Sequence, residues 1–279
     1  MPHPEPLVSV IVPCYEQAHF LADAIESVLG QTYPYHDIIV IDHGSTDNTA
    51  EIAAHYSKVR YVRQENQCKA AARNRGVRES TGSYLVFLDA DDRLLPEAFE
   101  TGLNCLNAHP ECGFVFGLCK FIAHDGSFLL TPEPPPRQGV DYVAMLRRCL
   151  INHTAQVLCR RAVFESGIVF DTSLTVCSDY DFYLRVARSS PIYCHHNVIS
   201  EYRRHKANRS RNNLRMLTSI LSILRSQRAF IEGDENYERA VRIGVRTARR
   251  FYYRQAGKQA ILDRLAAFKF YFKKVLRVS

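Results

Sequence analysis

Apolar runs that end in polar residues recur through the first ninety positions of the chain. The central run, at residues 84–88 (Tyr-Leu-Val-Phe-Leu), is followed by Asp89, Ala90, Asp91 and Asp92. Short apolar runs bounded in this way are typical of strands buried on both faces of a parallel sheet. The three acids then lie at the carboxyl end of a strand, where open α/β sheets bind their ligands. Further strands are predicted at residues 8–12, 37–42 and 59–62.

Helical periodicity fills the segments between these strands. Apolar residues recur every three or four positions in residues 20–29, and helices are also predicted near residues 50–53 and 69–79. This alternation of strand and helix predicts an α/β fold, a Rossmann-like and mostly parallel sheet with right-handed crossovers, flanked by helices. Later elements are less distinct: a strand at 114–116, a hairpin turn at Asp125-Gly126, and helices at 141–150 and 179–187.

From residue 213 the pattern becomes entirely helical. Two apolar stripes mark the helices, one formed by Leu214, Leu217, Leu221 and Leu224 and the other by Ile261, Leu265, Phe268, Phe272 and Val275. The sequence therefore predicts a first domain, residues 1–212, and a basic helical C-terminal region, residues 213–279, as an appendage.

The formal net charge of +7 is unevenly divided between these two parts. Residues 213–279 hold 15 Lys and Arg against 5 Asp and Glu, a net charge of +10, whereas residues 1–212 hold 21 against 24, a net charge of −3. This asymmetry predicts an anionic partner for the C-terminal region, either a membrane surface or a nucleic acid. The mixed aromatic and basic segment 268–274 suits a helix in a membrane interface, or equally one docked on protein with its basic residues solvated.

Composition excludes several other classes. No run of 18 uncharged apolar residues predicts a membrane span, and no charged-then-apolar leader precedes Leu7, so a cytoplasmic location is expected, with peripheral attachment to the inner face of a membrane as an option. The nine cysteines include no Cys-x-x-Cys pair, which favours reduced thiols over disulfides or a zinc site. The turn after the first strand contains neither Gly-x-Gly-x-x-Gly nor Gly-Lys-Ser/Thr, which argues against dinucleotide-binding and P-loop proteins.

The alternating acids Asp89 and Asp91 offer two oxygen ligands that could hold a divalent cation. A cation bound by few protein carboxylates keeps positions open for water and for phosphate oxygens, which suits a nucleoside diphosphate. The alternative is a solvated acidic turn in which Asp92 turns toward the next helix and caps it. For an isolated Asp-x-Asp motif the solvated turn is favoured. The choice between it and a cation site therefore depends on the neighbouring motifs.

Six segments, in order along the chain, resemble glycosyltransferase family 2. They are VSVIVPCY at 8–15, ESVLGQTYP at 26–34, IIVIDHGSTDNT at 38–49, AARNRG at 71–76, GSYLVFLDADD at 82–92 and SDYDFYLRV at 178–186. Each motif is weak alone, but their agreement is specific. The resemblance covers roughly residues 7–210 and implies a GT-A fold and an inverting, metal-dependent transfer of a sugar from a nucleotide diphosphate donor.

The resemblance also implies roles for particular residues. It makes Asp179 the catalytic base, Asp91 the direct ligand of Mn²⁺ or Mg²⁺, and His205 of the Tyr-Arg-Arg-His segment a second metal or diphosphate contact. Arg203 or Arg204 could touch phosphate. The donor-binding residues it implies are Pro13, Tyr15, Glu16, Asp42, His43, Arg73 and Asp89.

For several of these residues a structural role is an open alternative. Asp179 could be only the N-cap of its helix, Arg73 a solvated helix arginine, and His205 a structural histidine. Asn152-His153-Thr154 could enter the acceptor pocket, which the sequence does not settle.

Three departures from the family pattern bear on function. His43 stands where a second acid is usual, Glu16 where Asn is common, and Ser178 where an acid usually precedes the catalytic Asp. His43 puts uracil-type base recognition in question because histidine presents a different donor and acceptor pattern. The expected function is transfer to a saccharide or lipid-linked saccharide in surface polysaccharide or glycolipid synthesis. The alternative is an inactive nucleotide-sugar binding or scaffold protein, with a nucleic-acid binder far behind.

Overall fold

The computed structural model describes residues 5–275, without the side chains of Arg209 and of residues 258–275. The described chain divides into two compact units, of which the first comprises residues 5–145 and 149–206 and the second residues 146–148 and 207–275. The apolar stripe predicted from Ile261 to Val275 lies outside the described side chains.

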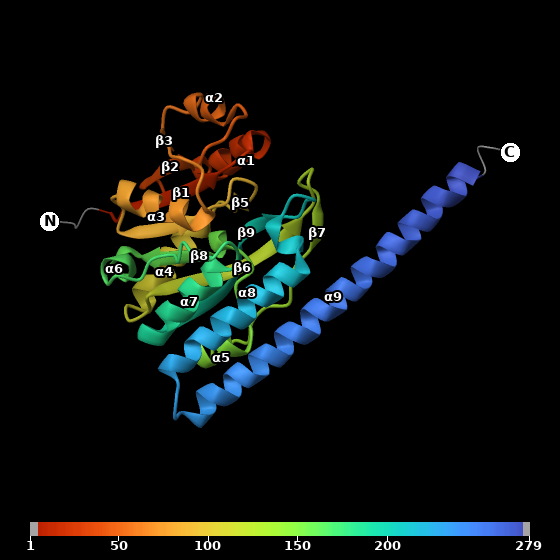
Figure 1. Ribbon diagram of the computed structural model, residues 1–279. Coiled ribbons are helices and arrows are strands. Elements are labelled where there is room, and N and C mark those ends of the chain that lie inside the picture. The colour runs from red at the N-terminus through yellow and green to blue at the C-terminus, as the bar shows by residue number, and fades with distance from the viewer. Residues whose placement is uncertain (1–4, 276–279) are drawn as a thin grey trace. The chain divides into compact units, whose positions relative to one another are not determined.

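The first unit is built on one mixed sheet in the order β3-β2-β1-β4-β8-β6-β9-β5, with β7 paired to β6 (Figure 1). The strands are β1 Val8–Cys14, β2 His36–Asp42, β3 Val59–Arg63, β4 Tyr84–Phe87, β5 Arg93–Leu94, β6 Phe114–Ile122, β7 Phe128–Leu130, β8 Val157–Arg160 and β9 Ile192–Arg203. The helices of this unit are α1 Ala18–Leu29, α2 Thr49–Ala54, α3 Lys69–Glu79, α4 Ala98–Ala108, α6 Arg161–Glu165 and α7 Ser178–Ser189; α5 Tyr142–Arg147 continues into the second unit.

The first four strands form the parallel half of the sheet that the sequence predicts. Cys14 of β1 pairs with Asp42 of β2, and Ile11 pairs with Phe87 of β4. Because these strands run in the same direction and in register, Asp42 and the acids after β4 lie at one edge of the sheet.

The second half of the sheet is mixed. Strand β8 is antiparallel to both β4 and β6, β6 is parallel to β9, and β5 is antiparallel to β9. Strand β9 ends at Arg203, and its pairing with β5 brings this end next to the acidic turn that follows β4. In the mixed half, the end of β9 therefore lies at the same edge of the sheet as the acids.

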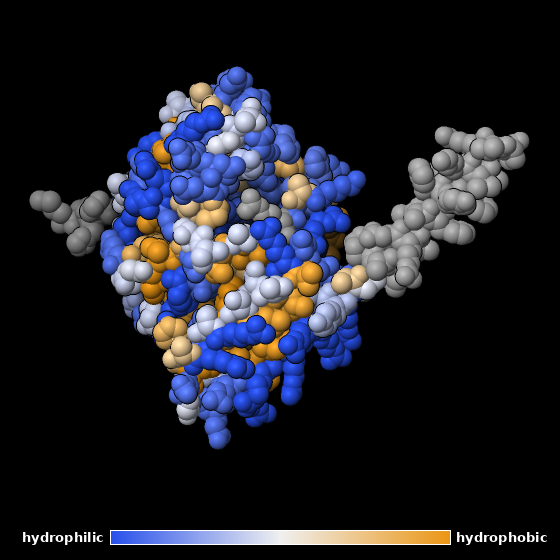
Figure 2. Space-filling view, in the orientation of Figure 1, coloured by the Kyte–Doolittle hydropathy of each residue, from blue (hydrophilic) through white to orange (hydrophobic). Residues whose placement is uncertain are grey.

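Close packing holds α3 against β1. A Cβ atom at Gly76 would lie 2.2 Å from Cγ2 of Ile11, so only glycine fits this contact. The core beneath is formed by strand residues with no exposed surface, such as Val10 and Val40. The end of the unit that carries α2 is largely hydrophilic on the face shown in Figure 2.

Two smaller predictions are confirmed in the first unit. The turn between β6 and β7 contains Asp125 and Gly126, and Gly126 adopts φ +85°, a conformation that favours glycine. All nine cysteines are free thiols. Among them, burial raises the pKa of Cys14 to about 12, as expected for a packing residue.

The second unit consists mainly of α8 Asn213–Ser226 and α9 Glu235–Val275, which lie side by side (Figure 1). Leu217 and Leu224 are buried as the apolar stripe predicts, but Leu214 is 74% exposed. The predicted stripe therefore begins one turn too early, and Ile223 is buried in this helix instead. No helix in the described part of the chain combines the length and the apolar character needed to cross a bilayer.

Candidate active site

Asp42 anchors the loop that follows β2. Its carboxylate is buried, with Oδ1 accepting from the backbone N–H of Ser45 at 2.8 Å and Oδ2 from the hydroxyl of Tyr61 at 2.5 Å. Burial, and then the bond to Asp42, raise the pKa of Tyr61 to about 12, so the phenol remains a donor. The loop is thus preorganised, and no sequence motif indicates the contribution of Tyr61.

The loops after β1 and β2 are tied together at the same edge. The ring of Tyr15 stacks on that of His43, with centroids 5.1 Å apart and planes at 20°. Oε1 of Glu16 accepts from the backbone N–H and the hydroxyl of Thr46, at 2.6 and 2.9 Å. Glu16 adopts φ +54°, a left-handed conformation that is strained for residues other than glycine. Pro13 lies buried in β1 just before this turn.

Asp89 is held by two cations from α3. Lys69 Nζ lies 2.9 Å from Oδ2, and Arg73 Nη2 lies 2.9 Å from Oδ1. Burial favours a higher pKa for Asp89, but Lys69 and Arg73 outweigh it and hold this pKa well below its usual range. Asp89 is therefore a carboxylate at neutral pH.

Arg73 is buried, with 3% of its surface exposed, so the alternative of a solvated helix arginine is wrong. Besides Asp89, its guanidinium donates to Oγ1 of Thr154 at 3.3 Å and lies over the ring of Phe170 at 5.3 Å from the centroid. Lys69, its partner on Asp89, was missed because the motif that indicates Arg73 begins two residues after it.

Asp91 and His205 meet although 114 residues separate them in the chain. Nε2 of His205 lies 2.8 Å from Oδ2 of Asp91, and both side chains are less than a tenth exposed. Arg204, the residue before His205, has its backbone N–H bonded to the carbonyl of Ile122, which fixes the end of β9. The structure thus brings together the two residues predicted as metal contacts.

Asp92 has a different role from the one expected. Instead of turning toward the next helix, its buried carboxylate lies 2.7 Å from Nδ1 of His153 and accepts the backbone N–H of Arg203 at 2.9 Å. Nε2 of His153 in turn lies 2.9 Å from Oγ of Ser200. Burial lowers the pKa of His153, but Asp92 more than reverses this and raises it to about 10.

His153 therefore reaches inward, with 3% of its surface exposed, and links the acidic turn to β9. The sequence indicated a residue near a pocket at this position, but nothing in it connects His153 with Asp92.

The end of β9 is locked by Arg203. Its buried guanidinium donates to the carbonyls of Asp91 and His124 and pairs with Asp23 at 2.7 Å. It also lies over the ring of Phe20, 4.8 Å from the centroid. These contacts assign Arg203 a structural role and leave Arg204, which is exposed, as the better candidate for a phosphate contact.

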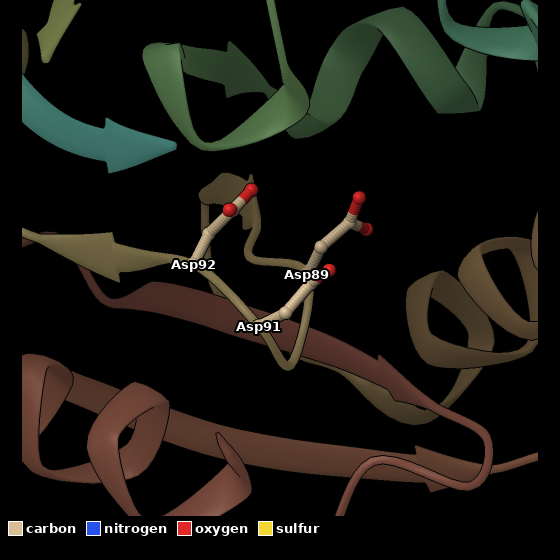
Figure 3. A group of neighbouring side chains, drawn as sticks. All are labelled: Asp89, Asp91 and Asp92. Atoms are coloured by element: carbon tan, nitrogen blue, oxygen red, sulfur yellow. The ribbon is translucent and has the colours of Figure 1, made fainter. Parts of the chain in front are cut away.

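The acidic turn fits a divalent cation, as Figure 3 illustrates. One oxygen from each of Asp89, Asp91 and Asp92 lies within 4.8 Å of the others. Both oxygens of Asp92 and both of Asp89 are bonded to protein groups. The pair best placed to hold a cation is thus the carboxylate of Asp91 with the imidazole of His205, an oxygen and a nitrogen donor that Mn²⁺ accepts.

Asp179 lies in the first turn of α7. The N-cap of this helix is Cys177, at φ +60°, so the alternative that Asp179 is the N-cap is wrong. Asp179 is half-buried and close enough to Arg73 to act on it: burial lowers the pKa of Arg73, but Asp89 and then Asp179 raise it. Asp181, two residues further along α7, pairs with Arg185 at 2.8 Å.

The fold of the chain is the GT-A fold of nucleotide-sugar transferases. A solved structure of this fold, the mannosyltransferase of Pyrobaculum calidifontis in complex with GDP-Man and Mn²⁺, superimposes with a TM-score of 0.65 at 20% sequence identity. The match covers 94% of this chain and 80% of that one.

The chain belongs to the family described as Glycosyl transferase family 2, which matches residues 9–167. It is 32% identical over 222 residues to an uncharacterized glycosyltransferase of Rickettsia prowazekii, a match that covers 76% of this chain and 68% of that protein. It is also 34% identical over 139 residues to a putative teichuronic acid biosynthesis glycosyltransferase of Bacillus subtilis, covering 46% of this chain and 54% of that protein. The protein is therefore a glycosyltransferase, as its motifs predict.

Proposed function

We propose that this glycosyltransferase is a metal-dependent, inverting enzyme. It transfers a sugar from a nucleotide diphosphate donor to a hydroxyl of a saccharide or lipid-linked saccharide. The observation that carries the proposal is the pairing of Asp91 with His205 at 2.8 Å, beside Asp89, at the carboxyl edge of the parallel strands. The mannosyltransferase that shares the fold is described with a nucleotide sugar and Mn²⁺, which supports this assignment by analogy.

The donor nucleotide lies across the loops after β1 and β2. The stacked rings of Tyr15 and His43 form an aromatic wall for the base, next to Pro13 and Glu16. Asp42 keeps the second loop in place through Ser45 and Tyr61 and borders the ribose. His43 offers a ring nitrogen where an acid is usual, so we expect the base preference to differ from that of enzymes with two acids.

Asp91 and His205 would hold Mn²⁺ or Mg²⁺, which when bound would stabilise the negative charge that develops on the departing diphosphate. Lys69 and Arg73 keep Asp89 ionised and fixed, and they add two positive charges near the site. This arrangement binds the leaving group and positions it without a covalent contribution from the protein.

Asp179 takes the proton of the acceptor hydroxyl. As that oxygen bonds to the anomeric carbon from one side, the bond to the diphosphate oxygen breaks on the other, and the configuration inverts. Asp179 lies in the first turn of α7, where the helix dipole favours its charged form. A half-exposed carboxylate at this position can receive a proton from a bound substrate.

The acceptor is a saccharide of a surface polysaccharide or glycolipid, a proposal supported by the likeness to the putative teichuronic acid enzyme. We also propose that the protein acts in the cytoplasm at the inner face of a membrane. Support for a membrane surface comes from α9, whose exposed arginines recur at Arg239, Arg242, Arg246, Arg249, Arg250 and Arg254. A helix with its basic residues on one face suits an anionic membrane surface. The aromatic and basic segment 268–274 lies outside the described side chains.

The test is a thermal-shift measurement with Mn²⁺, with a nucleoside diphosphate, and with both. We expect the two together to raise the melting temperature more than the sum of the separate shifts, because a cation held by Asp91 and His205 would strengthen the binding of the negatively charged diphosphate. Asp91→Asn should abolish this excess.

The matched control is Glu97→Gln, which neutralises an exposed acid six residues further along the chain. It should leave the excess unchanged. An Asp91→Asn protein that keeps the full excess would eliminate Asp91 as the ligand. A wild-type protein that shows the excess but releases no nucleotide from any donor would favour the inactive binding or scaffold protein.

A further inference from the structure

Strand β7 carries three consecutive apolar side chains that are exposed. Phe128, Leu129 and Leu130 have 62%, 48% and 46% of their surface exposed. Single exposed apolar residues are ordinary, and the first unit has others, such as Tyr35 and Val169. Three in succession form an apolar patch that covers both faces of one short strand, which favours an interaction surface.

The geometry of β7 favours a fluid partner over a rigid one. Neighbouring residues of a strand point to opposite faces, so Leu129 projects away from Phe128 and Leu130, yet both faces are exposed. A folded protein docked on this hairpin would cover one face only. The interfacial layer of a bilayer surrounds an inserted hairpin and covers both.

A second copy of the chain, paired through the free edge of β7, is the less favoured partner. Among the described residues, β7 pairs with β6 alone, so its other edge makes no strand pairing there. However, it has only three residues, and Pro132, Pro134, Pro135 and Pro136 follow it without backbone N–H groups. A short edge that runs into prolines offers few hydrogen bonds to an added strand.

Basic side chains flank the patch. The guanidinium of Arg204 lies over the ring of Phe121, 5.3 Å from its centroid, and Phe121 is the register partner of Leu130. Arg204 and Lys206 are exposed, and Lys120 is half-exposed. The acid of the hairpin, Asp125, accepts hydrogen bonds from Ser127 within its own turn. An apolar tip with cations beside it matches the headgroup region of an anionic bilayer.

The same hairpin is joined directly to the candidate active site. The carbonyl of His124, in its turn, accepts from Arg203, and the carbonyl of Ile122 accepts from the backbone N–H of Arg204. The next residue, His205, contacts Asp91. The hairpin thus contacts Arg203 and Arg204, which directly precede His205. A ligand bound at β7 is therefore connected to the proposed metal site through these residues.

We propose that the hairpin of β6 and β7 inserts Phe128, Leu129 and Leu130 into the interface of an anionic bilayer and so presents a lipid-linked acceptor to Asp91 and Asp179. The choice of acceptor rests on the proposed function, but insertion of the hairpin does not.

The test is cosedimentation of the full-length protein with vesicles of phosphatidylglycerol and phosphatidylcholine. We compare the wild type with the triple variant Phe128→Ser, Leu129→Ser, Leu130→Ser, which should bind about tenfold more weakly or worse, because three apolar side chains no longer leave water. The control triple variant Tyr35→Ser, Val169→Ser, Tyr193→Ser removes exposed apolar side chains elsewhere in the first unit. It should bind as the wild type does. Circular dichroism melting of each variant checks that it is folded.

Equal binding by the wild type and the hairpin variant would overturn the proposal, as would a wild type that binds no vesicles. A wild-type dimer in sedimentation analysis that the hairpin variant loses, with vesicle binding unchanged, would identify a second copy as the partner instead. The Mn²⁺ and nucleotide thermal shift is measured on the same samples. If the wild type shows no such thermal shift but its vesicle binding still depends on the hairpin, the proposed transferase mechanism is refuted. The hairpin proposal is then unaffected.

Discussion

At the scale of single residues, Asp179 is distinguished by its electrostatic interactions with two buried residues. It acts electrostatically on Arg73 and on Tyr183, whose buried hydroxyl has no hydrogen-bond partner among the described residues. Asp89 acts on the same two residues. The proposed base and the donor side of the site are therefore coupled through one arginine.

We predict that Asp179→Asn lowers turnover by a factor of about 10² to 10⁴, because the amide cannot accept the acceptor's proton. Affinity for the nucleotide should be unchanged, since Asp179 does not contact it in the proposed arrangement. Nucleotide release in steady state and isothermal titration with nucleoside diphosphate and Mn²⁺ measure the two quantities.

Asp181→Asn is the matched control for this experiment because it removes a carboxylate from the same helix turn. It loses the pairing with Arg185 and should lower the melting temperature, but it should retain turnover. If Asp179→Asn retained turnover as well, the base would have to be another group.

Sequence reasoning at this scale identified residues by their place after a strand or in a motif. Asp42, Asp89 and Asp91 were found because each follows an apolar run. His153, which joins Asp92 to Ser200, gave no such signal because its partners lie 61 and 47 residues away. Long-range pairing of polar side chains has no local pattern, so only the folded structure reveals it.

At the scale of elements, the packing of α3 on β1 sets the position of Lys69 and Arg73. A methyl group at Gly76 would overlap the side chain of Ile11. We predict that Gly76→Ala lowers the free energy of unfolding by about 1–3 kcal/mol, the usual cost of overpacking. Because the helix must shift, nucleotide binding should weaken as well. Urea denaturation measures the stability, and titration measures the binding.

Two further variants show whether this contact is the cause. Gly76→Ala combined with Ile11→Ala makes room at the contact and should recover part of the binding lost by Gly76→Ala alone. Gly257→Ala, in α9 where a Cβ meets nothing within 4 Å, should stabilise slightly through helix propensity. Loss of stability from Gly257→Ala equal to that from Gly76→Ala would rule out the steric explanation.

The parallel half of the sheet could be predicted because each of its strands is a short apolar run between helices. The mixed half could not, although 114–116 was recognised as strand. Strand β9 has no sustained alternation of buried and exposed positions, and His196 within it adopts φ +59°, which interrupts any regular period. Strand β5 has only two residues, too few to leave a pattern.

At the scale of the whole molecule, charge and apolar surface would contribute separately to the proposed membrane attachment. Residues 213–279 carry a net charge of +10, whereas residues 1–212 carry −3. Attraction between exposed charges is screened by salt, but burial of apolar side chains is not.

We predict that binding of the full chain to anionic vesicles falls at least tenfold when the ionic strength rises from about 0.01 M to about 1 M, as the Debye length shrinks from about 30 Å to about 3 Å. The double variant Arg246→Glu, Arg250→Glu should reproduce the loss at low salt. Cosedimentation across a salt series measures both.

Lys58→Glu with Arg78→Glu is the control, because it changes the net charge by the same amount through exposed residues of the first unit. It should retain most of the low-salt binding. Equal losses from the two double variants would mean that total charge, and not the basic face of α9, governs attachment.

The bonds of Asp92 also bear on how the protein is made. Lys69 and Arg73 hold Asp89, but Asp91 and Asp92 of the acidic turn contact His153, Arg203 and His205, which come much later in the chain. During translation, a ribosome that has released the first hundred residues has therefore exposed all three acids and the two cations beside Asp89, but none of the side chains that contact Asp91 and Asp92. The proposed site is complete only after residue 205 has left the exit tunnel, so activity has to wait until the first unit has been synthesised.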